Sequence, residues 1–191
     1  MKKVFYLGLL VLSLVIVTSN YSFAKENETI GAKDVPVTLD ELEHLGEVAY
    51  FNENTGEYFV WLDKTNEPSS LTSATYSNSS LRNFSFKIRY SLDVGYIYVP
   101  TSSIQAVIHD AYIGDSNSTV MNGFNDYPYA LDFSPRGLFG GQQTITMNIA
   151  TKKIGYLDGL RAGSDYYLTV RNPGRLPDGL YIYGSGSIFA N

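Results

Sequence analysis

Residues 83–90, Asn-Phe-Ser-Phe-Lys-Ile-Arg-Tyr, carry an apolar side chain at every second position. The apolar residues are Phe84, Phe86, Ile88 and Tyr90, and the residues between them are Ser85, Lys87 and Arg89. A period of two residues is typical of a β-strand, because successive side chains point to opposite faces of a sheet. The stretch therefore predicts a strand with one face in a hydrophobic core.

The sequence beyond this stretch repeats the same type of signal. Further strands are expected at residues 95–99, 104–113, 129–133, 144–149, 166–171, 180–183 and 187–190. The 16 Tyr and 10 Phe favour strands, and the 17 Gly favour turns between them. Short strands at intervals of roughly 8–12 residues indicate an all-β sandwich or barrel. We expect one such domain over residues 83–191.

Residues 160–170, Leu-Arg-Ala-Gly-Ser-Asp-Tyr-Tyr-Leu-Thr-Val, form a spaced motif. The motif resembles the tyrosine corner of fibronectin type III and related domains, with Ala162 where that family commonly has Pro. The resemblance implies that Leu160 plugs one end of the core, that Gly163 permits the turn, and that the Tyr166 hydroxyl bonds to the backbone upstream. It implies an immunoglobulin-like antiparallel β-sandwich.

The N-terminal 24 residues have the layout of a secretory signal peptide. Lys2 and Lys3 precede the apolar run 4–17, and small residues occupy positions 22 and 24. The run is shorter than the ~20 residues of a membrane span. We expect cleavage after Ala24 and a secreted mature chain with no integral membrane span.

Residues 25–63 are expected to form a short helix and a hairpin. Thr38 and Glu41 have the spacing of a capping box, which predicts a helix over 39–45. Two aromatic runs flank a polar loop that contains Gly56, as in a β-hairpin. Residues 64–82 are rich in Ser, Thr and Asn and read as a linker or long loop. Whether the hairpin joins the sandwich stays open.

The composition narrows the classes of function. The net charge is −5, and removal of Lys2 and Lys3 with the signal peptide makes it −7. An acidic chain is a poor candidate for binding nucleic acid, which needs a basic surface. The absence of cysteine fits a bacterial exported protein and excludes thiol catalysis and cysteine-based metal sites.

His109 is the one candidate for a catalytic base, with carboxylates drawn from Asp110, Asp126 or Asp132. Neighbouring strand residues face opposite sides of a sheet, so Asp110 is not expected to orient His109 directly. No serine nucleophile motif is present: residues 184–187, Gly-Ser-Gly-Ser, instead predict a bulge or a close approach of another backbone. We therefore expect a protein that is not an enzyme, without a cofactor.

The loop at residues 115–119 has oxygen-bearing side chains at alternate positions, as a calcium loop has. It lacks the Gly and the terminal Glu of an EF-hand, and an Asx-type turn explains the same residues. We expect no metal site, and a calcium ion near Asp115 stays an open alternative.

Six tyrosines are the candidate binding residues: Tyr96, Tyr98, Tyr127, Tyr129, Tyr181 and Tyr183. Tyrosine clusters suit contacts to glycans or proteins. Pairing across strands explains same-face tyrosines equally well.

The sequence thus favours a secreted bacterial binding module for an envelope polymer, a glycan or a surface protein, held at the cell surface without a covalent link if at all. A secreted hydrolase built on His109 is the alternative, and an exported bacteriocin-like effector is a second one. Self-association through exposed edge strands stays open.

Overall fold

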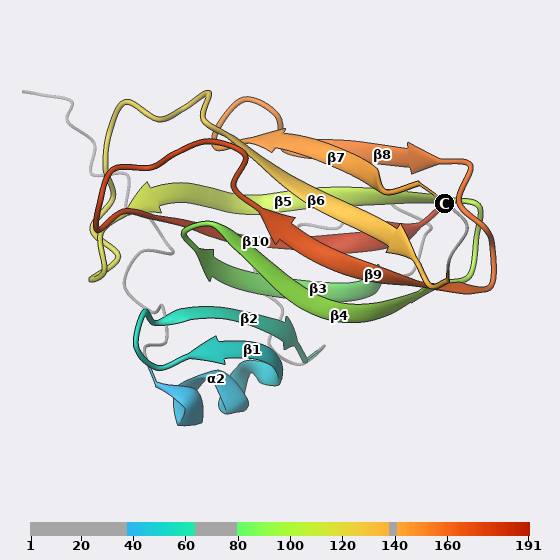
Figure 1. Ribbon diagram of the computed structural model, residues 1–191, viewed down its shortest axis with the longest axis horizontal. Coiled ribbons are helices and arrows are strands. Elements are labelled where there is room, and N and C mark those ends of the chain that lie inside the picture. The colour runs from blue at the N-terminus through green and yellow to red at the C-terminus, as the bar shows by residue number, and fades with distance from the viewer. Residues whose placement is uncertain (1–37, 64–79, 138–140) are drawn as a thin grey trace, which may run out of the picture. The chain divides into compact units, whose positions relative to one another are not determined.

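The computed structural model describes residues 38–63, 80–137 and 141–191, which all belong to one compact unit, Gly31–Asn191. These residues form an all-β sandwich of two antiparallel sheets, as expected (Figure 1). One sheet has six strands in the order β1-β2-β3-β10-β5-β8, and the other has four in the order β4-β9-β6-β7. The elements are α2 (Leu39–Leu45), β1 (Gly46–Asn52), β2 (Glu57–Leu62), β3 (Ser80–Ile88), β4 (Ser91–Val99), β5 (Ser103–Gly114), β6 (Pro128–Pro135), β7 (Gln143–Asn148), β8 (Ile154–Asp158), β9 (Ser164–Arg171) and β10 (Tyr181–Ala190).

The core lies between the two sheets and takes one face of each strand. Phe84, Phe86 and Ile88 of β3 are fully buried, as the alternation predicts. Tyr90, predicted on the same face, lies beyond the end of β3 and is 61% exposed, so the prediction is wrong for this residue. From the four-stranded sheet, Leu131, Phe133, Leu168 and Val170 enter the same cluster. The single tryptophan, Trp61, is also buried there, edge-on to Phe59 with ring centroids 4.8 Å apart. Trp61 therefore packs in the core, as expected.

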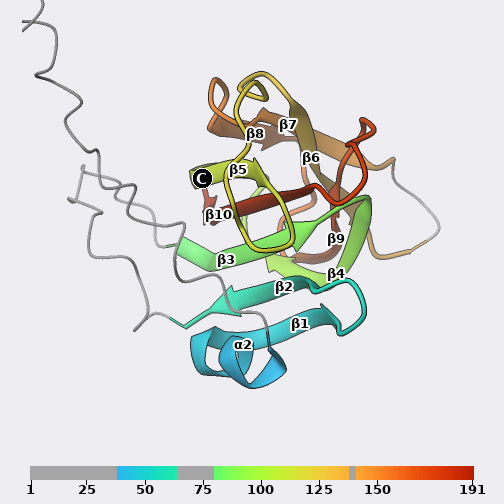
Figure 2. The same cartoon turned by 90° about the vertical axis from the view of Figure 1, so that its left-hand side faces the viewer.

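The N-terminal helix and hairpin form where the sequence predicts them. Thr38 and Glu41 make both bonds of the capping box of α2. Leu42 is the buried residue of this helix and packs with Tyr58 and Val60 of the hairpin. Figure 2 shows α2 lying against the hairpin of β1 and β2. Strand β2 pairs with β3, so the hairpin extends the six-stranded sheet. The hairpin therefore joins the sandwich, which the sequence left open. Residues 80–82 of the predicted linker instead begin β3, and residues 64–79 lie outside the described residues.

The tyrosine corner has the contacts that the resemblance implies. Leu160 and Tyr166 are buried in the core, and the backbone N–H of Arg161 donates to the Tyr166 hydroxyl over 2.6 Å. Gly163 has φ of +71°, a conformation that side chains with a Cβ rarely adopt. The corner anchors the start of β9 at one end of the sandwich.

In the part of the chain that the structure describes, no helix has the length and apolar character needed to cross a membrane. The proposed signal peptide, residues 1–24, falls outside that part.

Candidate functional site

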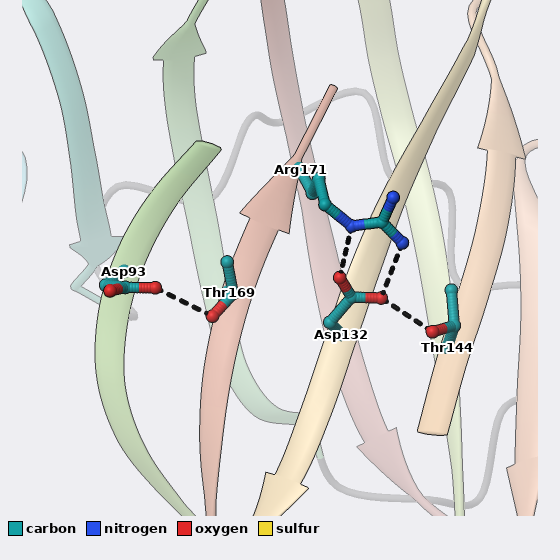
Figure 3. A network of polar contacts seen from close by, with 5 residues as sticks. All are labelled: Asp93, Asp132, Thr144, Thr169 and Arg171. Atoms are coloured by element: carbon teal, nitrogen blue, oxygen red, sulfur yellow. Dashed lines mark hydrogen bonds and ion pairs between the residues drawn. The ribbon is translucent and has the colours of Figure 1, made fainter. Parts of the chain in front are cut away.

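The outer face of the four-stranded sheet carries a row of polar side chains that crosses all four strands (Figure 3). The backbone register places Asp93 opposite Thr169, Thr169 opposite Asp132, and Asp132 opposite Thr144. Thr169 donates to Asp93 over 2.9 Å, and Thr144 donates to Asp132 over 2.6 Å. These bonds tie neighbouring strands together on the solvent side, so this face is a fixed surface.

Asp132 is the anchor of this row. Its carboxylate accepts two hydrogen bonds from Arg171, from Nε at 2.6 Å and from Nη2 at 3.2 Å. The Asp132 side chain is 4% exposed and that of Arg171 is 38% exposed. Burial alone would raise the pKa of Asp132, but the bonds from Arg171 and Thr144 outweigh it and hold this pKa below its ordinary value. Asp132 is therefore a charged structural group of the sheet.

Next to the polar row lies a group of aromatic and basic side chains that we call the tyrosine platform: Tyr96, Tyr98, Tyr167 and Arg136. Tyr96 and Tyr98 of β4 are 53% and 58% exposed. The ring of Tyr96 lies edge-on to Tyr167 at 5.2 Å, and the Arg136 guanidinium lies 5.2 Å from the Tyr96 ring centroid. Two neighbours thus fix the orientation of an exposed ring.

A β-bulge in β4 brings the platform and the polar row onto the same face. Asp93 and Tyr96 are three residues apart and would face opposite sides of a regular strand. The register with β9 shifts between Asp93 and Gly95, and Gly95 has φ of +111°. The extra residue resets the alternation, so Asp93, Tyr96 and Tyr98 all point outward. In the sequence, the residue that indicates this bulge is Gly95, a glycine inside a strand pattern.

A cleft of about 500 Å³ opens beside the platform, where β6 ends and β9 begins. We call it the arginine cleft; its lining residues include Arg136, Gly141, Gln143, Arg161, Ser164 and Asp165. Arg136 and Asp165 form an ion pair of 3.5 Å with both side chains well exposed. The Tyr98 hydroxyl lies beside this cleft, 3.7 Å from the point where a Cβ on Gly163 would stand. Arg136 belongs to both the platform and the cleft, so the two are continuous.

The other four predicted binding tyrosines lie elsewhere. Tyr127 is partly buried, packs edge-on to Phe124, and donates to Asn172 over 2.8 Å. Tyr129, Tyr181 and Tyr183 are buried, with exposed fractions of 0%, 9% and 2%. The prediction of an exposed binding cluster is therefore wrong for these three.

Each of the three has a packing role. Tyr129 points into the core of the sandwich against Phe86. Tyr183 stacks on Tyr112 with centroids 4.8 Å apart, and Lys87 Nζ lies 4.5 Å from the Tyr181 ring centroid. The Tyr183 hydroxyl also donates to the backbone carbonyl of Asp115 over 2.6 Å. Pairing across strands, the alternative explanation of these tyrosines, is confirmed for Tyr183 with Tyr112, and the contact of Tyr183 to the Asp115 loop adds to it.

His109 lies on the outer face of the six-stranded sheet. Its Nε2 is 2.7 Å from Ser187 Oγ, and Ser187 donates to Asn83 Oδ1 over 2.6 Å. Ser187 is 2% exposed. His109, Ser187 and Asn83 thus form a polar tie between strands β5, β10 and β3.

Of the three carboxylates proposed as partners of His109, Asp126 and Asp132 lie elsewhere and Asp110 lies on the same face. Asp132 belongs to the other sheet, and Asp126 accepts from Thr151 in a loop. Asp110 does share a face with His109, against expectation, because a bulge between Ser185 and Gly186 of β10 leaves His109 unopposed. There Asp110 lines a pocket of about 70 Å³ with Tyr58, Ser85 and Ser185.

The loop after β5 is an Asx-type turn. The Asp115 carboxylate accepts from the backbone N–H groups of Asn117 and Thr119, both over 2.9 Å. These backbone bonds lower the pKa of Asp115. Within residues 38–63, 80–137 and 141–191, no group of three or more His, Asp or Glu side chains is placed to hold a metal ion.

Comparison with known proteins identifies no family and no curated relative for this chain: no family model matches it, and no curated protein matches it. Among solved structures, the chain is similar to the crystal structure of protein SO0799 from Shewanella oneidensis, with 12% identity over 80% of this chain and 78% of the other and a TM-score of 0.31. At that level of similarity, no inference about this chain is drawn from it.

Proposed function

We propose that the protein is a secreted bacterial binding module, not an enzyme, that holds a glycan or related polymer of the cell envelope on the tyrosine platform. The observation that carries this proposal is the pair of outward tyrosines on β4, more than half exposed although Tyr96 has a fixed orientation. A protein partner at the same surface is the competing version.

The platform has the chemistry that a sugar ring needs. The face of an aromatic ring is negative, and it attracts the weakly positive C–H groups of a pyranose lying flat on it. A ring already held by Tyr167 and Arg136 loses little side-chain entropy when a ligand binds. The polar row beside it offers hydroxyl, carboxylate and guanidinium groups for hydrogen bonds to sugar hydroxyls.

The extracellular setting of the proposal rests on the sequence. The layout of residues 1–24 supports export, and the absence of cysteine fits a bacterial exported chain. The acidic net charge of the chain makes nucleic acid a poor partner.

The test is retention of the purified protein on envelope polysaccharide preparations, measured by affinity electrophoresis. We expect the wild type to be retarded and Tyr96→Ala and Tyr98→Ala each to weaken binding about tenfold, the usual effect of losing a central aromatic contact. Tyr90→Ala is the matched control, because Tyr90 is 61% exposed and also lies under an arginine, Arg89, at 5.3 Å. No retardation on any preparation, or equal loss in all three variants, contradicts the proposal.

A further inference from the structure

We infer that the arginine cleft binds an anionic group, a carboxylate or a phosphate, carried by the polymer that lies on the tyrosine platform. This inference rests on the proposed function and adds the chemical class of the ligand: an acidic polymer in place of a neutral one.

The first support is the charge of the cleft. Its lining, as far as the structure describes the chain, holds two arginines, Arg136 and Arg161, and one carboxylate, Asp165. The cleft therefore has an excess of positive charge in a chain whose net charge is −5. A local reversal of sign at a concave surface favours a ligand of the opposite charge.

The second support is that both guanidinium groups are available. In the described part of the chain, Arg161 has an exposed side chain and lies within ion-pair distance of none of the carboxylates. Arg136 pairs with Asp165 at 3.5 Å, but its side chain is 67% exposed, and such exposed pairs are weak. A guanidinium matches carboxylate and phosphate oxygens with two parallel hydrogen bonds.

The third support is the continuity of the cleft with the platform. Arg136 touches the Tyr96 ring and also lines the cleft, and the Tyr98 hydroxyl stands at the Gly163 wall. A polymer on the two tyrosines therefore places a substituent of a neighbouring unit next to Arg161. A volume of about 500 Å³ lies within the usual range of ligand sites.

Gly141 supplies a sharp way to test the charge requirement. Among the described residues, no atom lies within 4 Å of a Cβ placed on Gly141, and the backbone there is not in the left-handed region, so a side chain enters open space. Gly141→Glu places a negative charge in the cleft. Gly141→Gln has the same size without the charge and serves as its matched control.

The experiment measures binding by calorimetry to three probes: polygalacturonate, its methyl ester, and poly(glycerol phosphate). The methyl ester has the same sugar chain as polygalacturonate but no carboxylate charge. We expect a polyanion to bind at least tenfold more tightly than the methyl ester, with affinity falling as salt increases. Arg161→Gln and Gly141→Glu should each weaken this binding about tenfold or more. Gly141→Gln and Arg175→Gln, an exposed arginine outside the cleft, should stay within about twofold. Thermal unfolding of every variant checks that it is folded.

The outcomes separate the two proposals. Selective binding of polygalacturonate assigns a carboxylate, and selective binding of poly(glycerol phosphate) assigns a phosphate. Equal binding of the methyl ester, unchanged by Arg161→Gln and Gly141→Glu, overturns the anionic ligand but leaves a platform for neutral sugars. Absence of binding to all three probes overturns the inference; absence of binding to the envelope preparations as well overturns the proposed function.

Discussion

The hydroxyl of Tyr129 is the clearest anomaly at the scale of single residues. It is fully buried and has no hydrogen-bond partner among the described residues. A buried polar group without a partner costs about 1–3 kcal/mol. Tyr129→Phe removes the hydroxyl and keeps the ring against Phe86, so we expect the free energy of unfolding to rise by about 1 kcal/mol in urea denaturation. A loss of similar size would show that the hydroxyl has a partner.

Asp132 makes the stability of the protein depend on pH. Its pKa in the folded protein lies below the ordinary 3.8, so its ionised form contributes stability at neutral pH. That contribution is lost as the pH falls below about 4, through the folded pKa.

Asp132→Asn removes the charge that Arg171 and Thr144 contact. We expect a loss of about 2 kcal/mol at pH 7, the usual value of hydrogen bonds to a charged group, and a smaller loss of stability on going from pH 5 to pH 2. Asp93→Asn, which changes an exposed carboxylate two strands away in the same sheet, should cost less than about 0.5 kcal/mol at pH 7. Equal losses in the two variants would contradict the anchoring role of Asp132.

Whether a tyrosine is buried or exposed depends on its register in the strand, which the composition of the sequence does not show. Tyr127 and Tyr129 flank Pro128, but Pro128 begins β6 and the alternation of that strand turns Tyr129 into the core. Tyr181 and Tyr183 share a face, as expected, yet Lys87 and the Asp115 turn cover that face. Only the cross-strand partners, which lie far away in sequence, separate these tyrosines from Tyr96 and Tyr98.

At the scale of elements, β10 is the strand in which glycines decide the packing. The sequence predicts two strands, 180–183 and 187–190, but one strand runs from Tyr181 to Ala190 through Gly184 and Gly186. The aromatic ring of Phe86 fills the space over Gly184, and the backbone oxygen of Val107 approaches Gly186 at the bulge. The predicted close approach and bulge are therefore confirmed at Gly186.

Gly186→Ala tests this packing. The added Cβ would stand 2.5 Å from the Val107 carbonyl oxygen, so the backbone of β5 or β10 must move. We expect a loss of about 2 kcal/mol, typical of overpacking in a core. Gly141→Ala, where the Cβ enters open space, should change stability by less than about 0.5 kcal/mol. If thermal unfolding shows no difference between the two variants, the strands are not packed as described.

Elements that depend on local alternation were predictable, whereas the irregular ones were not. Strand β8 is short, and Gly155 interrupts the alternation of apolar and polar residues that would predict it. The side chains of Ile145 and Met147, from the other sheet, occupy the space where a side chain of Gly155 would lie. The bulges in β4 and in the β5–β10 pair arise from pairing with distant strands. The bulge in β4 determines the site, because it brings Asp93 to the side of Tyr96. The bulge in the β5–β10 pair brings Asp110 to the side of His109 on the other sheet.

At the scale of the whole molecule, the two outer faces differ in character. On the six-stranded sheet, α2 packs on the hairpin, and buried polar groups such as Ser187 and Lys87 sit in its centre. The four-stranded sheet instead presents a tied polar row and the exposed tyrosine platform. The sandwich, its tyrosine corner and the exposure of two of the six candidate tyrosines, Tyr96 and Tyr98, could be predicted from the sequence. The arginine cleft could not, because it forms where β6 ends and β9 begins, and these strands are distant in the sequence.

The most direct measurement of the central claim is hydroxyl-radical footprinting of the protein with and without an envelope polysaccharide that retains it. Four tyrosines serve as internal reporters, since Tyr90, Tyr96, Tyr98 and Tyr156 are each more than half exposed. The account predicts that the ligand protects Tyr96 and Tyr98 from oxidation and leaves Tyr90 and Tyr156 unchanged. Protection of Tyr156 or Tyr90 with Tyr96 and Tyr98 still reactive would place the binding surface elsewhere and contradict the account.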